Sequence, residues 1–152
     1  MTDPIPFTPD LSVRPEVAAF YDKETGTISY VVKDPKSAAC AVIDSVMDID
    51  YAAGRIAYAN ADRIIQHIKD RGLELEWIIE THAHADHLSA APYIKARSGA
   101  QIGNGEHIRD VQDIFHPVFA ADDLKARGGD FDHLFADGER FRIGELEVEV
   151  MH

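Results

Sequence analysis

Three histidines and one aspartate lie close together near the middle of the chain, at His82, His84, Asp86 and His87. They follow the apolar run 77–79, which is typical of a short buried strand. Imidazole nitrogens and carboxylate oxygens are ligands that zinc, iron and manganese share. His82 and His84 are two positions apart, so on extended backbone their side chains point the same way. The four residues are therefore candidate metal ligands.

The residues around this cluster also favour a bound ion. The segment 88–96 is typical of the start of a helix, which places the cluster on a strand-to-helix loop, where open α/β sheets usually carry their chemistry. Ala83 and Ala85 are small enough for the loop to fold tightly. A nearby helix N-terminus disfavours protonated histidine and so keeps the imidazoles able to bind metal. A solvated loop without an ion is the alternative, but such a dense set of ligands favours a metal site.

Composition limits the size of the protein and the class of its partners. The chain has 152 residues and 45% hydrophobic composition, which suits one domain, 1–152, with a real core. It carries 27 Asp and Glu residues against 15 Lys and Arg, a formal charge of -12. Such a surface repels phosphate backbones and anionic lipid, so we expect no nucleic acid or membrane partner.

The cysteine content and the N-terminus indicate the compartment. Cys40 is the single cysteine, which excludes a disulfide within the chain and a Cys-rich zinc site. The N-terminal residues show no cationic-then-apolar signal, and no apolar run approaches the roughly 20 residues that span a bilayer. We therefore expect a cytoplasmic protein.

The alternation of apolar residues predicts a mixed α/β fold after an irregular, proline-rich arm at 1–16. A polar loop is expected at 45–59, and Asn60 is expected to cap the helix that follows it. The expected strands are 17–21, 27–32, 39–44, 73–79, 101–103, 141–143 and 146–151, and the expected helices are 60–71, a helix from 88 to Gly99, and one that ends near 115. The order strand, helix, strand around 60–71 indicates a sheet with parallel and antiparallel parts.

The segment Thr81–His87 resembles the signature of the metallo-β-lactamase superfamily. The flanking residues 41–44 and 77–90 resemble the branch that contains persulfide dioxygenase and glyoxalase II, and the resemblance extends from about Ala18 onward. It implies an αββα sandwich of two sheets with outer helices, of which this chain would hold the first half. Further metal ligands are then expected beyond His152, and the isolated 152 residues are expected to be inactive.

The persulfide dioxygenase resemblance implies one iron, Fe2+, and the conversion of glutathione persulfide and O2 to sulfite. His82 would bind the iron, while His84, Asp86 and His87 would orient water and ligand. The glyoxalase II resemblance implies two metals, such as zinc, and hydrolysis of a thioester. There His82 and His84 would bind one ion, and Asp86 and His87 the other.

The resemblance also implies roles for residues near the ligands and for partners. Asp86 is the candidate catalytic residue, and Asp44 and Thr81 are expected to support the metal loop without binding the ion. The substrate is expected to be a small glutathione-derived molecule. Because half of a sandwich leaves inward-facing residues uncovered, we also expect a homo-oligomer, a dimer. The third hypothesis is a metal-binding fragment without catalytic activity.

Overall fold

The computed structural model describes residue 8 and residues 10–119 and 128–152. Its central element is a six-stranded sheet in the order β1-β2-β3-β6-β8-β9. The strands β1, β2 and β3 pair antiparallel, whereas β3, β6, β8 and β9 pair parallel. The bounds are β1 Glu16–Tyr21, β2 Ile28–Lys33, β3 Ala39–Ile43, β6 Glu74–Ile79, β8 Gln101–Gly105 and β9 His133–Phe135. The predicted mixed sheet is therefore confirmed.

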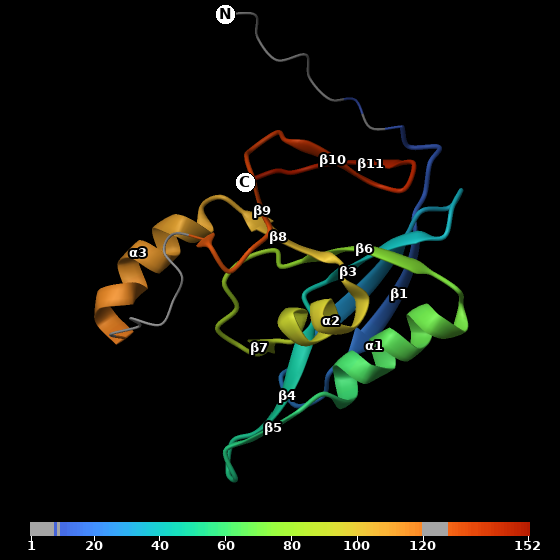
Figure 1. Cartoon of the computed structure of the whole chain (residues 1–152). Helices are drawn as coiled ribbons and strands as arrows, with labels where there is room; N and C mark the ends of the chain where they lie inside the picture. Colours follow the sequence, from blue (N-terminus) through green and yellow to red (C-terminus); the bar gives the residue numbers. More distant parts are fainter. Residues whose placement is uncertain (1–7, 9, 120–127) are drawn as a thin grey trace, which may run out of the picture.

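Two helices cover one face of this sheet. Helix α1, Ala59–Asp70, connects the two halves of the sheet, and α2, Ala91–Ser98, lies beside it (Figure 1). Their fully buried residues Ile64 and Ile94 pack with Ile78 of β6 in one core cluster. Burying aliphatic side chains of this size is worth about 1.5–3 kcal/mol each, so this layer holds the sheet in place.

A β-hairpin covers the opposite face. It consists of β10, Arg140–Ile143, and β11, Leu146–Glu149, which pair antiparallel as the sequence predicted. Ile143 packs with Ala39 and Ala41 of β3 in a second buried cluster. In Figure 1 the hairpin lies above the sheet, and α1 and α2 lie below it. The order of layers is thus helices, sheet and hairpin.

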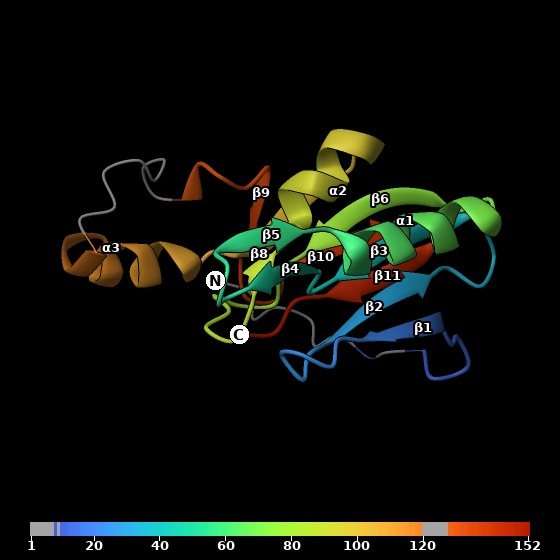
Figure 2. The ribbon, with the colours of Figure 1, turned by 90° about the horizontal axis from the view of Figure 1, so that it is seen from below.

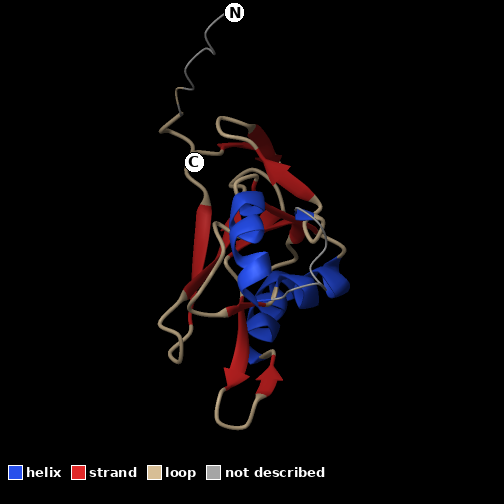
Figure 3. Cartoon of the chain, turned by 90° about the vertical axis from the view of Figure 1, so that its left-hand side faces the viewer, coloured by secondary structure: helices blue, strands red, loops and turns tan. Residues whose placement is uncertain are grey.

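A small second sheet corrects two sequence predictions. The strands β5, Arg55–Ala57, β4, Val46–Asp50, and β7, Leu88–Ser89, pair in that order, and β4 and β5 form a hairpin that projects from the body (Figure 3). The predicted polar loop at 45–59 is therefore wrong for most of its length. The predicted helix start at Leu88 is also wrong, because Leu88 and Ser89 pair with Met47 and Val46 and α2 begins only at Ala91.

The start of α1 also differs from the prediction. The helix begins after Tyr58, with no side-chain cap, and Asn60 lies within its first turn. The Asn60 carboxamide donates hydrogen bonds to Asp22 and Asp48, at 3.1 and 2.7 Å. Its partners come from other elements, so Asn60 ties α1 to the end of β1 and to the middle of β4 and does not cap the helix.

Helix α3, Ile108–Phe119, extends away from the rest of the chain in two perpendicular views (Figures 1 and 2). It is longer than the predicted helix and continues past Pro117. The segment 115–131 was predicted to be loop-rich, but residues 115–119 belong to α3, and 120–127 lie outside the described residues. In the part of the chain that is described, no helix has both the length and the apolar character needed to cross a membrane.

Candidate metal centre

The histidine-rich segment is a loop at the carboxyl end of the parallel strands. β6 ends at Ile79, and the Glu80 amide donates a hydrogen bond to the Gly103 carbonyl of β8 at 3.0 Å. On the other side, the Asp44 amide donates to the Ile79 carbonyl at 2.9 Å. The start of the loop is thus fixed from both neighbouring strands. Its far end at His87 runs directly into β7, so both ends are held by sheet pairing.

Asp44 holds the loop from behind. Among the described residues it is the one non-glycine with positive φ, +50°, a left-handed conformation that Asp tolerates better than most residues. Its carboxylate accepts hydrogen bonds from the Thr81 amide at 2.7 Å and the Thr81 hydroxyl at 2.8 Å, and lies 2.9 Å from His84 Nε2. Asp44 and Thr81 therefore lie where supporting residues were predicted, and their effect on a metal stays a prediction.

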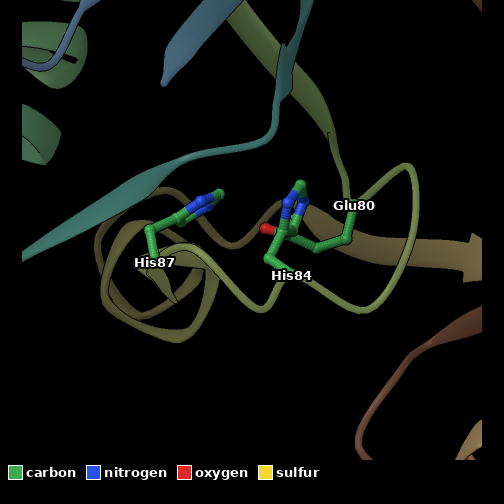
Figure 4. A group of neighbouring side chains, drawn as sticks. All are labelled: Glu80, His84 and His87. Carbon is green, nitrogen blue, oxygen red and sulfur yellow. The ribbon is translucent and has the colours of Figure 1, made fainter. Parts of the chain in front are cut away.

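The loop brings its three histidine rings together. The ring centroids of His82 and His84 are 4.2 Å apart, and those of His84 and His87 are also 4.2 Å apart. One possible ligand atom from each of Glu80, His84 and His87 lies within 4.8 Å of the other two. Figure 4 shows the Glu80 and His84 side chains meeting, with His87 beside them. The arrangement offers two imidazoles and one carboxylate to a single point.

His87 offers ring nitrogens that a metal ion could bind. His87 is 5% exposed, and neither of its buried ring nitrogens makes a hydrogen bond in the described structure, although Asp86 Oδ2 lies 3.4 Å from Nδ1. Leaving a buried polar group unpaired costs about 1–3 kcal/mol. Glu80 is also buried: Oε1 accepts a hydrogen bond from the Ser89 hydroxyl at 2.7 Å, and Oε2 lies 3.4 Å from His84 Nε2. A transition metal would satisfy the His87 ring, so the residues present fit such an ion.

Two pKa shifts describe the charge state of the loop. The Glu80 and Asp44 carboxylates beside its ring raise the pKa of His84 to about 9. Metal binding through His84 therefore releases a proton at neutral pH. A hydrogen bond from the Thr27 hydroxyl, 2.8 Å long, lowers the pKa of Asp86 to about 2. Asp86 is thus an ionised carboxylate that can accept hydrogen bonds or bind a cation, and it is a poor proton donor.

The structure brings two of the four predicted ligands into one cluster and places the other two beside it. His84 and His87 lie in one cluster, His82 lies beside it on the exposed side, and Asp86, with a 53% exposed side chain, is bound to Thr27 at the edge. Sequence reasoning missed Glu80. Its position four residues before His84, at the end of a buried strand, was the available signal.

Cavities border the loop on two sides. One of about 830 Å³ lies between the sheet and the β10–β11 hairpin and is mainly apolar, with Phe141 and Ile143 among its walls. The other, of about 320 Å³, lies against α2 and is lined by both His84 and His87. His82 lines both cavities, so a ligand in either one can reach the histidine cluster.

Comparison with known proteins identifies the family of the chain. The sequence model of the protein family described as the metallo-beta-lactamase superfamily matches residues 23–152. The "Beta-lactamase hydrolase-like protein" of Xylella fastidiosa strain Temecula1 is 44% identical over 137 residues, which are 90% of this chain and 32% of that protein. "Glyoxylase B2" of Dictyostelium discoideum is 38% identical over 143 residues, 93% of this chain and 49% of that protein. The chain therefore spans 32% and 49% of the length of these two curated relatives.

A solved structure shares the fold. The crystal structure of ETHE1 from Myxococcus xanthus superimposes with a TM-score of 0.59 at 23% sequence identity. The match covers 87% of this chain and 45% of that one. At this identity the likeness concerns the fold, and it agrees with the predicted partial sandwich.

Proposed function

The chain belongs to the metallo-beta-lactamase superfamily, and we propose that the whole protein is a metal-dependent enzyme that oxidises glutathione persulfide. In this reaction persulfide, O2 and water give glutathione, sulfite and two protons. The observation that carries the proposal is the buried, unpartnered His87 ring beside His84 and Glu80. A site of this kind has no evident structural purpose, because a leucine in place of His87 would avoid the cost of burying an unpaired imidazole.

His84, His87 and Glu80 would hold the ion, with His82 at the exposed side. Two imidazoles and one carboxylate are the ligand set that iron(II) oxygenases use, and zinc accepts the same ligands. A bound ion supplies Lewis acidity and, if it is iron, redox chemistry with O2. Asp44 keeps the His84 ring in place through its 2.9 Å contact to Nε2. Fixing a metal-binding imidazole in this way typically changes metal affinity or activity about 10–100-fold.

The position of Asp86 supports one ion over two. Its carboxylate is engaged by Thr27 and lies outside the cluster of Glu80, His84 and His87. A second ion would need this carboxylate as a ligand, in competition with the Thr27 hydrogen bond and the 3.4 Å contact to His87 Nδ1, both of which are made by Oδ2. We therefore assign Asp86 the role of orienting substrate or water at the edge of the site.

A glyoxalase II-like thioester hydrolase is the second candidate. The name of the 38% identical Dictyostelium relative, Glyoxylase B2, favours it. In that reaction His82 and His84 would serve one ion and Asp86 and His87 another. Water would attack the thioester carbonyl, and the thiol would leave as glutathione.

One experiment separates the two candidates. The iron-loaded and the zinc-loaded protein are each given glutathione persulfide and S-lactoylglutathione, and O2 uptake, sulfite and thioester hydrolysis are measured. We expect O2 uptake with stoichiometric sulfite from the iron form, and loss of both in His84→Ala. His67→Ala, which changes a histidine of α1 that contacts Phe20, is the matched control and should retain activity. Hydrolysis by the zinc form without O2 uptake by the iron form would replace the dioxygenase with the thioesterase.

A further inference from the structure

Asn104 is a buried polar residue that the metal cluster does not include. It lies in β8, is 3% exposed, and points to the same side of the strand as Ile102, two residues earlier, which belongs to the main core. The alternation of side chains along β8 therefore predicts an apolar residue at position 104. A buried carboxamide is unfavourable there unless its donor and acceptor groups find partners.

The Asn104 carboxamide makes no hydrogen bond to another described residue, and its nitrogen and oxygen are not among the fully enclosed polar atoms, so they reach the surface of a cavity. None of the hydrogen bonds among these residues involves its side chain, although an asparagine offers two donors and one acceptor oxygen. The same side chain lines both cavities at the metal loop, where it shares the dividing wall with Glu80 and His82. Its free polar atoms therefore face space that a ligand of the loop can enter.

The chemistry of the walls restricts that ligand. Among the described residues, neither cavity is lined by a lysine or arginine, whereas Glu80 lines both and Asp130 lines the smaller one. The chain as a whole carries a formal charge of -12. Apart from the ion itself, the surroundings therefore disfavour a carboxylate on the ligand and accept an uncharged group.

We propose that Asn104 is a substrate-binding residue that hydrogen-bonds an uncharged amide next to the reacting sulfur, in the 320 Å³ cavity beside His84 and His87. A carboxamide both donates and accepts, so it complements the N–H and C=O of a peptide bond. The charged ends of a glutathione-derived substrate would then lie outside this cavity. The inference rests on the proposed function, since it assigns one part of the same thiol-derived substrate.

Two thiols that differ in one charged group test the assignment. N-acetylcysteamine carries a thiol and a neutral amide, and N-succinylcysteamine is the same molecule extended by a carboxylate. Their binding to the zinc-loaded protein is measured by isothermal titration calorimetry. Loss of one neutral hydrogen bond corresponds to a change of up to about tenfold in affinity, so we expect Asn104→Leu to bind N-acetylcysteamine several-fold to tenfold more weakly. The wild type is expected to prefer N-acetylcysteamine over N-succinylcysteamine.

Stability and metal content distinguish a binding role from a structural one. Asn104→Leu removes an unpartnered amide, so its unfolding temperature should be equal or higher, with unchanged zinc content. Asn60→Leu is the matched control, because the Asn60 carboxamide is paired with Asp22 and Asp48. That variant should melt at a lower temperature and bind N-acetylcysteamine as the wild type does.

Three outcomes overturn the assignment: no binding of N-acetylcysteamine by the wild type, equal binding by Asn104→Leu, or a lower unfolding temperature of Asn104→Leu with unchanged affinity. If binding follows the expectation but neither glutathione persulfide nor S-lactoylglutathione is turned over, the proposed reaction fails and the role of Asn104 stands. If turnover is normal and Asn104→Leu binds like the wild type, only the role of Asn104 fails.

Discussion

The loop 80–87 and the β10–β11 hairpin adjoin the same sheet but are held by different kinds of contact. The loop is polar and is fixed by Asp44, whose carboxylate binds Thr81 twice and His84 once. The hairpin is held mainly by apolar packing, with Ile143 3% exposed against Ala39 and Ala41 of β3. The loop therefore depends on the direction of a few hydrogen bonds, and the hairpin depends on buried area.

This difference separates function from stability along the chain. The loop leaves the His87 nitrogens without a hydrogen bond, with only a 3.4 Å contact from Nδ1 to Asp86, and so costs free energy in the absence of a ligand. The hairpin adds stability and contributes no group to the metal cluster. Substitutions in the two regions should accordingly affect different measurements, and the following experiments test that separation.

The largest effect on stability is expected in the hairpin. Ile143→Ala removes a buried aliphatic side chain, which typically costs 2–5 kcal/mol, so the free energy of unfolding in urea should fall by about that amount. Metal content of the folded variant should be unchanged. Met151→Ala is the control, since Met151 is 86% exposed although it borders the same cavity, and it should unfold like the wild type. A loss of metal in folded Ile143→Ala would show that the two regions are coupled.

The largest effect on metal binding short of removing a ligand is expected at Asp44. Asp44→Asn keeps a residue that tolerates φ of +50° but removes the charge that holds His84. We expect metal affinity, measured by competition with a chelator, to fall about 10–100-fold with little change in unfolding temperature. Asp50→Asn, at the exposed end of β4, is the control and should bind metal normally. Equal affinities for all three proteins would mean that Asp44 serves only the backbone turn.

A smaller effect on stability is expected at Asp34, whose carboxylate accepts a hydrogen bond from the Glu145 amide in the turn between β10 and β11. Hydrogen bonds from the Ser37 hydroxyl and from the Glu145 and Lys36 amides lower the pKa of Asp34 below its usual 3.8. The folded chain binds a proton at Asp34 less readily than the unfolded chain does. The Asp34 carboxylate therefore stabilises the fold above pH 3.8, and this stabilisation is lost as the pH falls through the lower pKa of the folded state.

Asp34→Asn should therefore make stability less dependent on pH in the acid range below about 4, which urea unfolding at a series of pH values measures. Metal affinity at neutral pH should stay the same, because Asp34 contacts the hairpin turn and not the loop. An unaltered acid dependence in this variant would argue that the carboxylate contributes nothing to holding the hairpin.

Local patterns allowed the strands and the ligand cluster to be predicted, and tertiary contacts explain the errors. Alternation identified the last strand, predicted at 146–151 and observed at 146–149, and ligand density identified the loop, because both signals lie within a few consecutive residues. The β4–β5 hairpin is a local pairing that was missed because its segment is rich in polar residues, whereas the pairing of β4 with β7, about forty residues later, has no local signal. Asn60 was misassigned because Asp22 and Asp48, from distant segments, bind its amide.

In the candidate metal centre, too, only the contacts between residues close in sequence could be predicted. The spacing of His82 and His84 suggested a shared direction, and their rings do lie together. The sequence could not show that Thr27 binds Asp86 from 59 positions away, or that Glu80 turns toward His84 at the strand end. Such contacts depend on how the segment before β2 and the loop after β6 come together in the folded chain.

The central claim is that His87 is buried for a metal, and His87→Leu tests it most directly. Bound metal per chain is measured by mass spectrometry for the wild type, for His87→Leu and for His67→Leu, together with the unfolding temperature of each metal-free protein. We predict that His87→Leu loses the metal while its metal-free form is at least as stable as the wild type, because an unpaired buried imidazole has been replaced by an apolar side chain. His67→Leu should keep the metal. Full metal content in His87→Leu, or a metal-free form destabilised as strongly as by a core substitution, would contradict the account.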